Sequence, residues 1–260
     1  MFRQKMEKSA KKAKSNIILA LDLPADKPRR IVSRSLQILN SAHPYLCALK
    51  LNRQAVLPLG LFNGVQKILS RAHDLSLPTI MDAKINDIGS TNRAIAEYYY
   101  KAGFDAVICN PFVGWNEGMQ PIFEVAHRMK RGVILLVYMS HKGAAEGYGQ
   151  IVQDSTTKQL VPQYRIFAEK ALKWNADGAV VGATYPDRIR EIHAVLKDKV
   201  PIYSPGIGAQ GGDATAAVKA GASYLIVGRT IVEAKDPAKT AEQIRDVAWR
   251  SLRNRTTKAE

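Results

Sequence analysis

The sequence predicts a single α/β domain that closes into a (β/α)8 barrel, or TIM barrel. Short apolar runs of strand length recur along the 260 residues and alternate with segments of helical periodicity. Strands that alternate with helices at this spacing favour parallel pairing, and eight of them fit the roughly 250 residues that a closed barrel needs. The competing fold, an open doubly wound sheet, carries a glycine-rich fingerprint after its first strand, where this chain has Asp22-Leu23-Pro24.

The predicted strands are short apolar runs, and several end in a polar side chain. Residues 16–22 end in the carboxylate of Asp22, which is typical of a buried parallel strand whose last residue reaches the open end of the barrel. Residues 46–51 are apolar apart from Lys50, and a lysine there is desolvated unless carboxylates meet it. The remaining strands are predicted at residues 79–84, 105–109, 132–138, 177–182, 200–204 and 223–228.

Each predicted strand precedes a helical segment. Pro24 and Pro28 mark a turn and a helix start after the first strand, and Gly103 suits the C-cap of the third helix. Residues 142–157 lack periodicity and are rich in Gly, Ser, Thr and Gln, so we expect a long loop, which is a common form of lid. The helices are predicted at about residues 28–42, 62–75, 92–102, 117–130, 161–174 and 186–197, and after Pro237.

The charged stretch at the end of the third strand carries the strongest chemical signal. In an extended strand the side chains alternate between faces, so Asp82 and Lys84 project the same way. Asp87 lies in the turn that follows. Two carboxylates and an ammonium in a partly dry pocket are costly unless the charges alternate in space, which favours a functional array. The alternative is a surface ion pair, with Asp87, Ser90 or Thr91 as the N-cap of the next helix.

The polar side chains at the strand ends point to one rim of the barrel. In a (β/α)8 barrel the active residues come from the carboxyl ends of several strands. Five polar residues fall at such ends, namely Asp22, Lys50, Asp82, Lys84 and Ser140. Surface solvation does not explain five independently placed polar groups on one rim, so we predict an active site there.

The loops after the seventh and eighth strands predict a phosphate site, because (β/α)8 barrels frequently bind phosphate at that position. Residues 205–212 read PGIGAQGG, and Gly228 and Arg229 follow the eighth strand. Glycine-rich turns are common on their own, so their position carries the argument. Arg229 can bind phosphate oxygens through two hydrogen bonds; the alternative for Arg229 is a salt bridge at the rim.

The formal net charge is +15, and much of it lies at the two ends of the chain. Residues 1–15 contain six basic residues and one acidic residue, and residues 245–260 contain five and two. Such ends are usually solvated or frayed. No aromatic-interleaved basic motif accompanies them, so no nucleic-acid binding is predicted. We predict a basic extension at residues 1–15, the barrel at 16–253 and a tail at 254–260.

Cys47 and Cys109 lie in apolar strand-like runs, and no secretory signal precedes them. This favours a reducing, cytoplasmic setting with two buried thiols. The longest apolar run, residues 132–139, is far shorter than the roughly 20 residues that a membrane span needs, so no membrane association is predicted. The histidines lack metal-ligand spacing, so no metal site is predicted.

These motifs jointly resemble the orotidine 5′-monophosphate decarboxylase family over about residues 16–245. The resemblance rests on Leu19-Ala20-Leu21-Asp22, Lys50, Asp82-x-Lys84-x-x-Asp87-Ile88-x-x-Thr91, Met139-Ser140-His141, Pro205 to Gly212 and Val227-Gly228-Arg229. It implies decarboxylation of orotidine 5′-monophosphate to uridylate without a cofactor, the last step of UMP biosynthesis. It also implies a homodimer with shared active sites.

The resemblance also implies roles for individual residues. It implies an alternating charge array made of Lys50, Asp82, Lys84 and Asp87. Lys84 is the expected proton donor to C6 of the pyrimidine, and Asp87, Ile88 and Thr91 are expected to reach the neighbouring subunit's site. Further substrate-binding roles are the ribose for Asp22, the pyrimidine for Ser140, the base and phosphate for Gln210, and the phosphate for Arg229 beside Gly228.

Two positions depart from the family's pattern. Gly89 stands where many members have proline, which is expected to loosen the turn after the third strand. Val232 stands where some members have a tyrosine that helps at the phosphate, so Arg229 and Gln210 are expected to do more of that work. The glycine-rich loop at residues 206–212 is the expected lid.

Two other functions compete with decarboxylation. One is a sugar-phosphate lyase or aldolase of the same barrel superfamily, which shares Asp-x-Lys-x-x-Asp but holds a divalent metal and tends to place an acid at the position of Lys50. An ammonium there repels Mg²⁺. The other is a catalytically silent barrel that binds nucleotides or nucleic acid through its basic ends.

Overall fold

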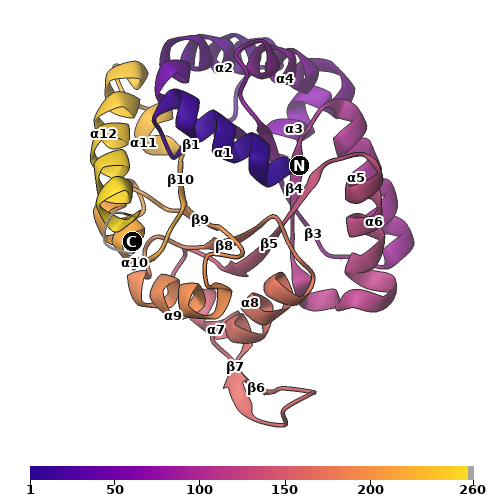
Figure 1. The fold of residues 1–260 in the computed structure, drawn as a ribbon. Helices are drawn as coiled ribbons and strands as arrows, with labels where there is room; N and C mark the ends of the chain where they lie inside the picture. The colour runs from indigo at the N-terminus through magenta and orange to yellow at the C-terminus, as the bar shows by residue number, and fades with distance from the viewer. Residues whose placement is uncertain (257–260) are drawn as a thin grey trace.

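The computed structural model describes residues 1–256, and eight parallel strands in it form a closed barrel (Figure 1). The strands are β1 (Ile17–Ala20), β2 (Ala48–Asn52), β3 (Thr79–Ile85), β4 (Ala106–Cys109), β5 (Gly132–Tyr138), β8 (Gly178–Val181), β9 (Ile202–Pro205) and β10 (Tyr224–Val227). Around the barrel they follow the order β1, β10, β9, β8, β5, β4, β3, β2. Each overlaps a strand predicted from the sequence, so the (β/α)8 prediction is confirmed.

Helices follow the strands and cover the outside of the barrel (Figure 1). The helices that match predicted segments are α2 (Pro28–Ala42), α4 (Val65–Asp74), α5 (Gly89–Ala102), α6 (Gln120–Arg128), α8 (Gln163–Lys173), α9 (Pro186–Leu196) and α12 (Pro237–Thr256). Shorter elements that the sequence did not predict individually are α3 (Arg53–Leu59), α7 (Ala144–Gly147), α10 (Ala214–Ala220), α11 (Arg229–Val232), η1 (His43–Tyr45), η2 (Gly60–Gly64), η3 (Pro111–Val113) and η4 (Trp115–Met119).

The core has two layers, one inside the barrel and one between the strands and the outer helices. Successive residues of a strand point alternately into one layer and the other. In β1, Ile17 and Leu19 belong to the cluster between the strands and the outer helices, whereas Ile18 and Ala20 belong to the cluster inside the barrel. All four are buried. Because both faces of each strand are covered, the strands read as continuous apolar runs, and a polar side chain among them stands out.

The amino-terminal extension is a helix, α1 (Phe2–Ala13), which lies across one end of the barrel (Figure 1). The prediction of a solvated or frayed leader is wrong, because charge alone hid an apolar stripe at helical spacing. Phe2, Met6 and Ala10 are buried and pack into the inner cluster of the barrel. The Arg3 guanidinium donates to the Lys199 carbonyl at 2.6 Å, which ties the helix to the opposite wall.

The segment predicted as a long loop at residues 142–157 is more ordered than expected. It contains α7 and one strand of a separate antiparallel hairpin, β6 (Ile151–Gln153) with β7 (Leu160–Pro162), which projects from the barrel (Figure 1). The carboxylate of Asp154 accepts hydrogen bonds from the backbone N–H groups of Thr156 and Thr157 and fixes the hairpin turn. Strands of three residues are too short to give a recognisable period in the sequence.

The carboxyl-terminal end also departs from the prediction. The predicted tail at residues 254–260 is wrong for residues 254–256, which extend α12, and residues 257–260 lie outside the described part of the chain. Arg255 donates to the carbonyls of Val218 and Ala222 at 2.9 and 3.1 Å. The basic residue therefore anchors the helix end rather than standing in solvent.

Cys47 and Cys109 are both free and buried, as the sequence predicted. Burial raises the pKa of both thiols well above the usual range for cysteine. Neither thiol therefore has the character of a reactive thiolate. Within the described residues, no helix has both the length and the apolar content to cross a bilayer.

Candidate active site

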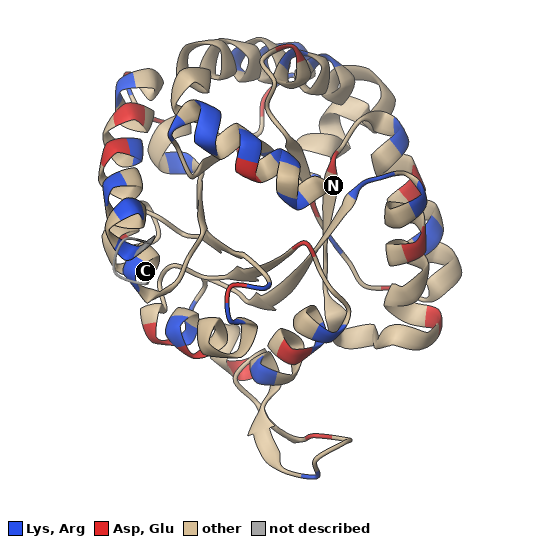
Figure 2. Cartoon of the chain, viewed as in Figure 1, with Lys and Arg blue, Asp and Glu red and all other residues tan. Residues whose placement is uncertain are grey.

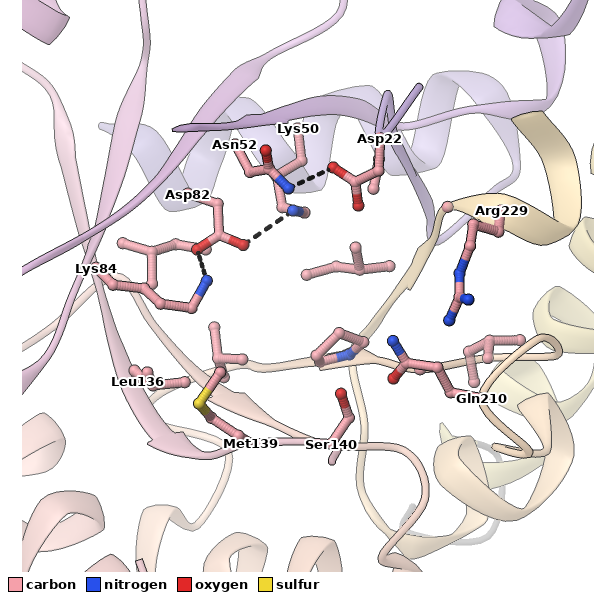
Figure 3. A pocket seen from close by; sticks show the side chains of 18 of the residues that line it. Asp22, Lys50, Asn52, Asp82, Lys84, Leu136, Met139, Ser140, Gln210 and Arg229 are labelled. Carbon is pink, nitrogen blue, oxygen red and sulfur yellow. Dashed lines mark hydrogen bonds and ion pairs between the residues drawn. The ribbon is translucent and has the colours of Figure 1, made fainter. Parts of the chain in front are cut away.

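The rim predicted from the sequence surrounds a cavity of about 370 Å³ (Figure 3). Its walls come from strand ends and from the loops that follow them, as expected for the catalytic end of a (β/α)8 barrel. The lining residues that the sequence also predicted are Asp22, Lys50, Asp82, Lys84, Ser140, Gln210, Gly228 and Arg229. Strands far apart in the sequence thus bring these side chains to one space.

A chain of alternating charges occupies one side of the cavity (Figure 3). The Lys50 ammonium lies 2.9 Å from Oδ2 of Asp82, and the Lys84 ammonium lies 2.6 Å from Oδ1 of the same carboxylate. The exposed fractions of the Lys50, Asp82 and Lys84 side chains are 5%, 14% and 29%. Lys84 is thus the member of the chain most accessible from the cavity.

The charges hold one another ionised. Burial opposes ionisation of Asp82, but the Lys50 and Lys84 ammonium groups outweigh it and lower its pKa to about 2. Burial likewise disfavours the charged form of Lys50, yet the carboxylates of Asp82 and Asp22 raise its pKa. A lysine inside a barrel strand is therefore stable as an ammonium because carboxylates surround it.

The backbone of β3 departs from regular geometry at Lys84. Its φ is +49°, in the left-handed region that is uncommon for residues other than glycine and foreign to a regular strand, and the register between β3 and β4 shifts between Met81 and Ile85. Simple strand alternation predicted that Asp82 and Lys84 share a face, and they do. The irregularity of the strand, which the sequence did not reveal, aims the ammonium.

Sequence reasoning missed two polar residues of the cavity wall, Asn52 and Gln54. Asn52 Nδ2 donates to Oδ1 of Asp22 at 2.7 Å, and Asn52 Oδ1 accepts from the Gln54 backbone N–H at 2.8 Å. Asn52 therefore orients the Asp22 carboxylate. The available signal was its spacing of two residues from Lys50, which puts both on one face of β2.

Gln210 and Arg229 lie across the cavity from the charge chain (Figure 3). The alternative of a rim salt bridge is not realised, because no carboxylate within the described residues pairs with Arg229. The loop that carries Gln210 is tied to Thr230, whose Oγ1 donates to the Ile207 carbonyl at 3.1 Å and accepts from the Ala209 N–H at 3.0 Å. Because no carboxylate of the described residues pairs with it, the Arg229 guanidinium is available to an anion.

A glycine is needed where this loop meets Thr230. Gly208 has a φ of +73°, and a Cβ there would lie 2.4 Å from Thr230 Oγ1. Any larger residue would face both backbone strain and a steric clash.

Three predicted residues do not line this cavity, namely Asp87, Ile88 and Thr91. Asp87 and Ile88 are exposed, and Ile88 keeps 67% of its surface accessible. The helix N-cap is Ile88, and no side chain caps α5. The alternative of Asp87, Ser90 or Thr91 as a capping side chain is therefore not realised.

Gly89, which was expected to loosen the turn after the third strand, is tightly packed. Gly89 is buried at the start of α5, and a Cβ there would lie 2.7 Å from the Glu117 carbonyl oxygen. The turn thus relies on a close backbone approach that a side chain would prevent.

Comparison with known proteins decides the family. The family model described as Orotidine 5′-phosphate decarboxylase / HUMPS family matches residues 15–244. The chain belongs to this family. The resemblance drawn from the sequence motifs is confirmed.

Relatives in the orotidine 5′-phosphate decarboxylase family span nearly the whole chain. The orotidine 5′-phosphate decarboxylase of Methanosarcina mazei is 34% identical over 92% of this chain and 97% of its own length. That of Pyrococcus abyssi is 36% identical over 88% and 97%. The structure of the Methanocaldococcus jannaschii decarboxylase in complex with the inhibitor BMP has a TM-score of 0.76 and 27% identity, and covers 90% of this chain and 98% of that one.

Proposed function

We propose that this protein decarboxylates orotidine 5′-monophosphate to uridylate, the last step of UMP synthesis, without a metal or cofactor. The proposal rests mainly on the charge chain Lys50–Asp82–Lys84, which is joined by ion pairs of 2.9 and 2.6 Å. This chain lies at one side of a cavity, and Arg229 lies at the other side (Figure 3). Relatives along nearly the full chain are named for the same reaction.

The cavity offers a complementary group for each part of the nucleotide. Arg229 and Gln210 would bind the phosphate, because a guanidinium and an amide match its oxygens. Asp22, oriented by Asn52, would accept hydrogen bonds from the ribose hydroxyls. Ser140 would contact the pyrimidine edge. C6 of the base would then face Lys84, which lies across the cavity from Arg229 (Figure 3).

The chemical step requires one proton and no redox change. The bond from C6 to the carboxylate carbon breaks, CO2 leaves, and the electron pair remains on C6. The Lys84 ammonium then gives its proton to C6 and becomes neutral. Asp82, ionised beside the departing carboxylate, disfavours the bound carboxylate more than the product, while Lys50 holds Asp82 in position.

The charge chain alone does not supply the whole rate enhancement. One ion pair at about 4 Å with an effective dielectric near 20 is worth roughly 4 kcal/mol, whereas enzymes typically remove about 8–23 kcal/mol from the barrier. Binding energy from the remote phosphate would therefore enforce the reactive arrangement. We propose residues 206–212 as the lid, because they connect the phosphate-binding end to the cavity wall.

We propose a homodimer in which each subunit lends Asp87, Ile88 and Thr91 to its partner's site. This explains why these three residues of the family signature lie outside the cavity of their own chain, with Asp87 and Ile88 exposed. Phe62 and Tyr98 form an exposed edge-to-face pair with centroids 6.4 Å apart, and they keep 53% and 55% of their surface accessible. Exposed aromatic side chains of this kind are typical of protein interfaces.

Lys50 disfavours the alternative of a metal-dependent sugar-phosphate lyase or aldolase of the same barrel superfamily. Lys50 is 4% exposed, and its ammonium already pairs with the Asp82 carboxylate that a metal would need. A divalent cation would meet repulsion there. The two buried, unpaired thiols support the cytoplasmic setting expected from the sequence.

An absorbance assay of decarboxylation tests the proposal directly. Orotidine 5′-monophosphate is mixed with the purified protein without added metal, and conversion to uridylate is followed by the change in pyrimidine absorbance. Turnover that disappears in the Lys84→Ala protein supports the proposal. Wild-type protein that binds the nucleotide but never releases CO2 would leave a silent nucleotide-binding barrel as the function.

A further inference from the structure

The end of the barrel opposite the candidate active site has a second cavity, of about 490 Å³, beside α1. Figure 2 shows basic residues along α1, which crosses this end of the barrel. The cavity is lined by one face of α1 and by segments near the starts of β3, β4 and β5, comprising Lys5, Lys8, Ser9, Lys12, His73, Ser76, Leu77, Asp105 and Arg131.

Positive charge in this cavity exceeds negative charge. Among its described lining residues Asp105 is the single carboxylate, and it is 3% exposed. Lys5 and Arg131 bind its Oδ1 at 2.7 and 2.5 Å, so its charge is already compensated. Lys8 and Lys12 have no acidic partner within the described part of the chain.

Two further details concern the cationic groups of this cavity. The Nε of Arg131 is buried and has no acceptor among the described residues, and a buried donor without a partner is uncommon in a folded protein. Lys8 and Lys12 are four residues apart on one helix, where like charges repel. An anionic ligand bound between Lys8 and Lys12 would relieve this repulsion.

We propose that this cavity binds an oligophosphate, such as inorganic triphosphate or the triphosphate group of a nucleotide. Lys5, Lys8 and Lys12 form one stripe of α1 at spacings of three and four residues. With a rise of 1.5 Å per residue, Lys5 and Lys12 are about 10 Å apart along the helix axis. One phosphate group does not span that length, whereas a chain of two or three does.

The α1 side of the site lies outside the family match, which begins at residue 15, and the whole site lies at the end of the barrel opposite the candidate active site. It is therefore separate from the reaction proposed above and does not depend on it. Because a bound oligophosphate would bridge α1 and the barrel wall, it would also stabilise the docked helix against unfolding.

Calorimetric titration of inorganic triphosphate into the Arg229→Ala protein tests this site, since that background weakens phosphate binding in the candidate active site. We expect one binding event per chain and a higher melting temperature with ligand. Adding Lys8→Gln and Lys12→Gln should weaken binding about tenfold or more. The matched control, Lys11→Gln with Lys14→Gln, removes the same charge from an exposed position of α1 and from its exposed C-cap, both outside the cavity, and should weaken binding less than about twofold.

A parallel titration with a nucleoside triphosphate distinguishes the two sources of the ligand. Equal affinity would identify the phosphate chain as the recognised group, and tighter binding would identify a nucleotide; both depend on Lys8 and Lys12. Absence of saturable binding at millimolar ligand, or equal loss in the two double variants, would overturn the proposal. Circular dichroism of each variant checks that α1 remains folded.

Discussion

Asn92 holds the backbone of Asp87 from both sides. Its Oδ1 accepts from the Asp87 N–H at 3.0 Å, and its Nδ2 donates to the Asp87 carbonyl at 2.6 Å. The same Nδ2 donates to the Gly118 carbonyl at 2.9 Å, and Asn92 is fully buried. One side chain thus fixes the turn that presents Asp87 to solvent and, in the proposed dimer, to the neighbouring site.

Asn92→Ala should impair both stability and turnover. The change leaves the Asp87 N–H and the Gly118 carbonyl without their partner, which costs about 2–3 kcal/mol in the free energy of unfolding. It should also lower kcat more than KM rises, because Asp87 loses its position. Urea unfolding and steady-state kinetics measure the two effects, with the exposed Ser90→Ala as control. Unchanged kcat in a stable Asn92→Ala protein would contradict the positioning role.

Lys84→Ala should abolish decarboxylation while the fold survives. Lys84 is the proposed proton donor, and loss of a general acid alone costs about 10²–10⁴-fold in rate. The absorbance assay measures the rate, and thermal unfolding measures the fold. Lys101→Ala removes an exposed lysine that pairs with Glu97 at 3.6 Å and should keep full activity. Turnover of Lys84→Ala at the wild-type rate would remove it as donor.

Mixed subunits should recover activity if the sites are shared. Asp87→Ala and Lys84→Ala proteins should each be inactive, but a hybrid dimer contains one site with both residues intact. Random exchange of equal amounts makes half of the dimers hybrid, so about a quarter of the wild-type activity should return. Activity is measured after mild denaturation and refolding of the mixture. A mixture as inactive as its parents would count against the shared site.

Chelation should leave activity unchanged. Lys50 and Lys84 occupy both oxygens of Asp82, so no carboxylate of the charge chain is free for Mg²⁺. Activity is measured after exhaustive dialysis against EDTA, and again after Mg²⁺ is returned. Loss on dialysis followed by recovery with Mg²⁺ would favour the metal-dependent alternative.

Acid should destabilise the protein through Asp82. Its pKa is about 2 in the folded state and about 3.9 in an unfolded chain. The unfolded state therefore binds the proton first as pH falls, so this contribution is present above about pH 5 and is lost toward pH 2. The shift corresponds to about 2.6 kcal/mol.

Urea unfolding of wild-type and Asp82→Asn proteins between pH 6 and pH 3 measures this effect. The variant should lose less stability on acidification than the wild type. Asp187→Asn, which alters an exposed carboxylate on α9, should follow the wild-type slope. The same slope in all three proteins would show that Asp82 is not the linked group.

The sequence by itself determined the barrel and most of the residues at the rim of the candidate active site. Strands buried on both faces must be apolar throughout, so the eight runs were readable and Lys50 stood out among them. Because parallel strands all end at the same rim, polar residues at those ends had to converge, whatever their separation in the chain. Asp22, Lys50, Asp82 and Lys84 accordingly line one cavity in the structure, as their positions in the sequence predicted.

Only the tertiary structure decided what depends on contacts between distant segments. The apolar stripe of α1 is buried only because the helix packs against the open end of the barrel. The sequence alone showed its charges but not that packing partner, so the helix was not predicted. The hydrogen bonds from Asn52 to Asp22 and from Asn92 to Gly118 link residues about 30 positions apart, without a local pattern to reveal them. The left-handed backbone of Lys84 likewise results from packing between neighbouring strands, because local propensity alone disfavours it.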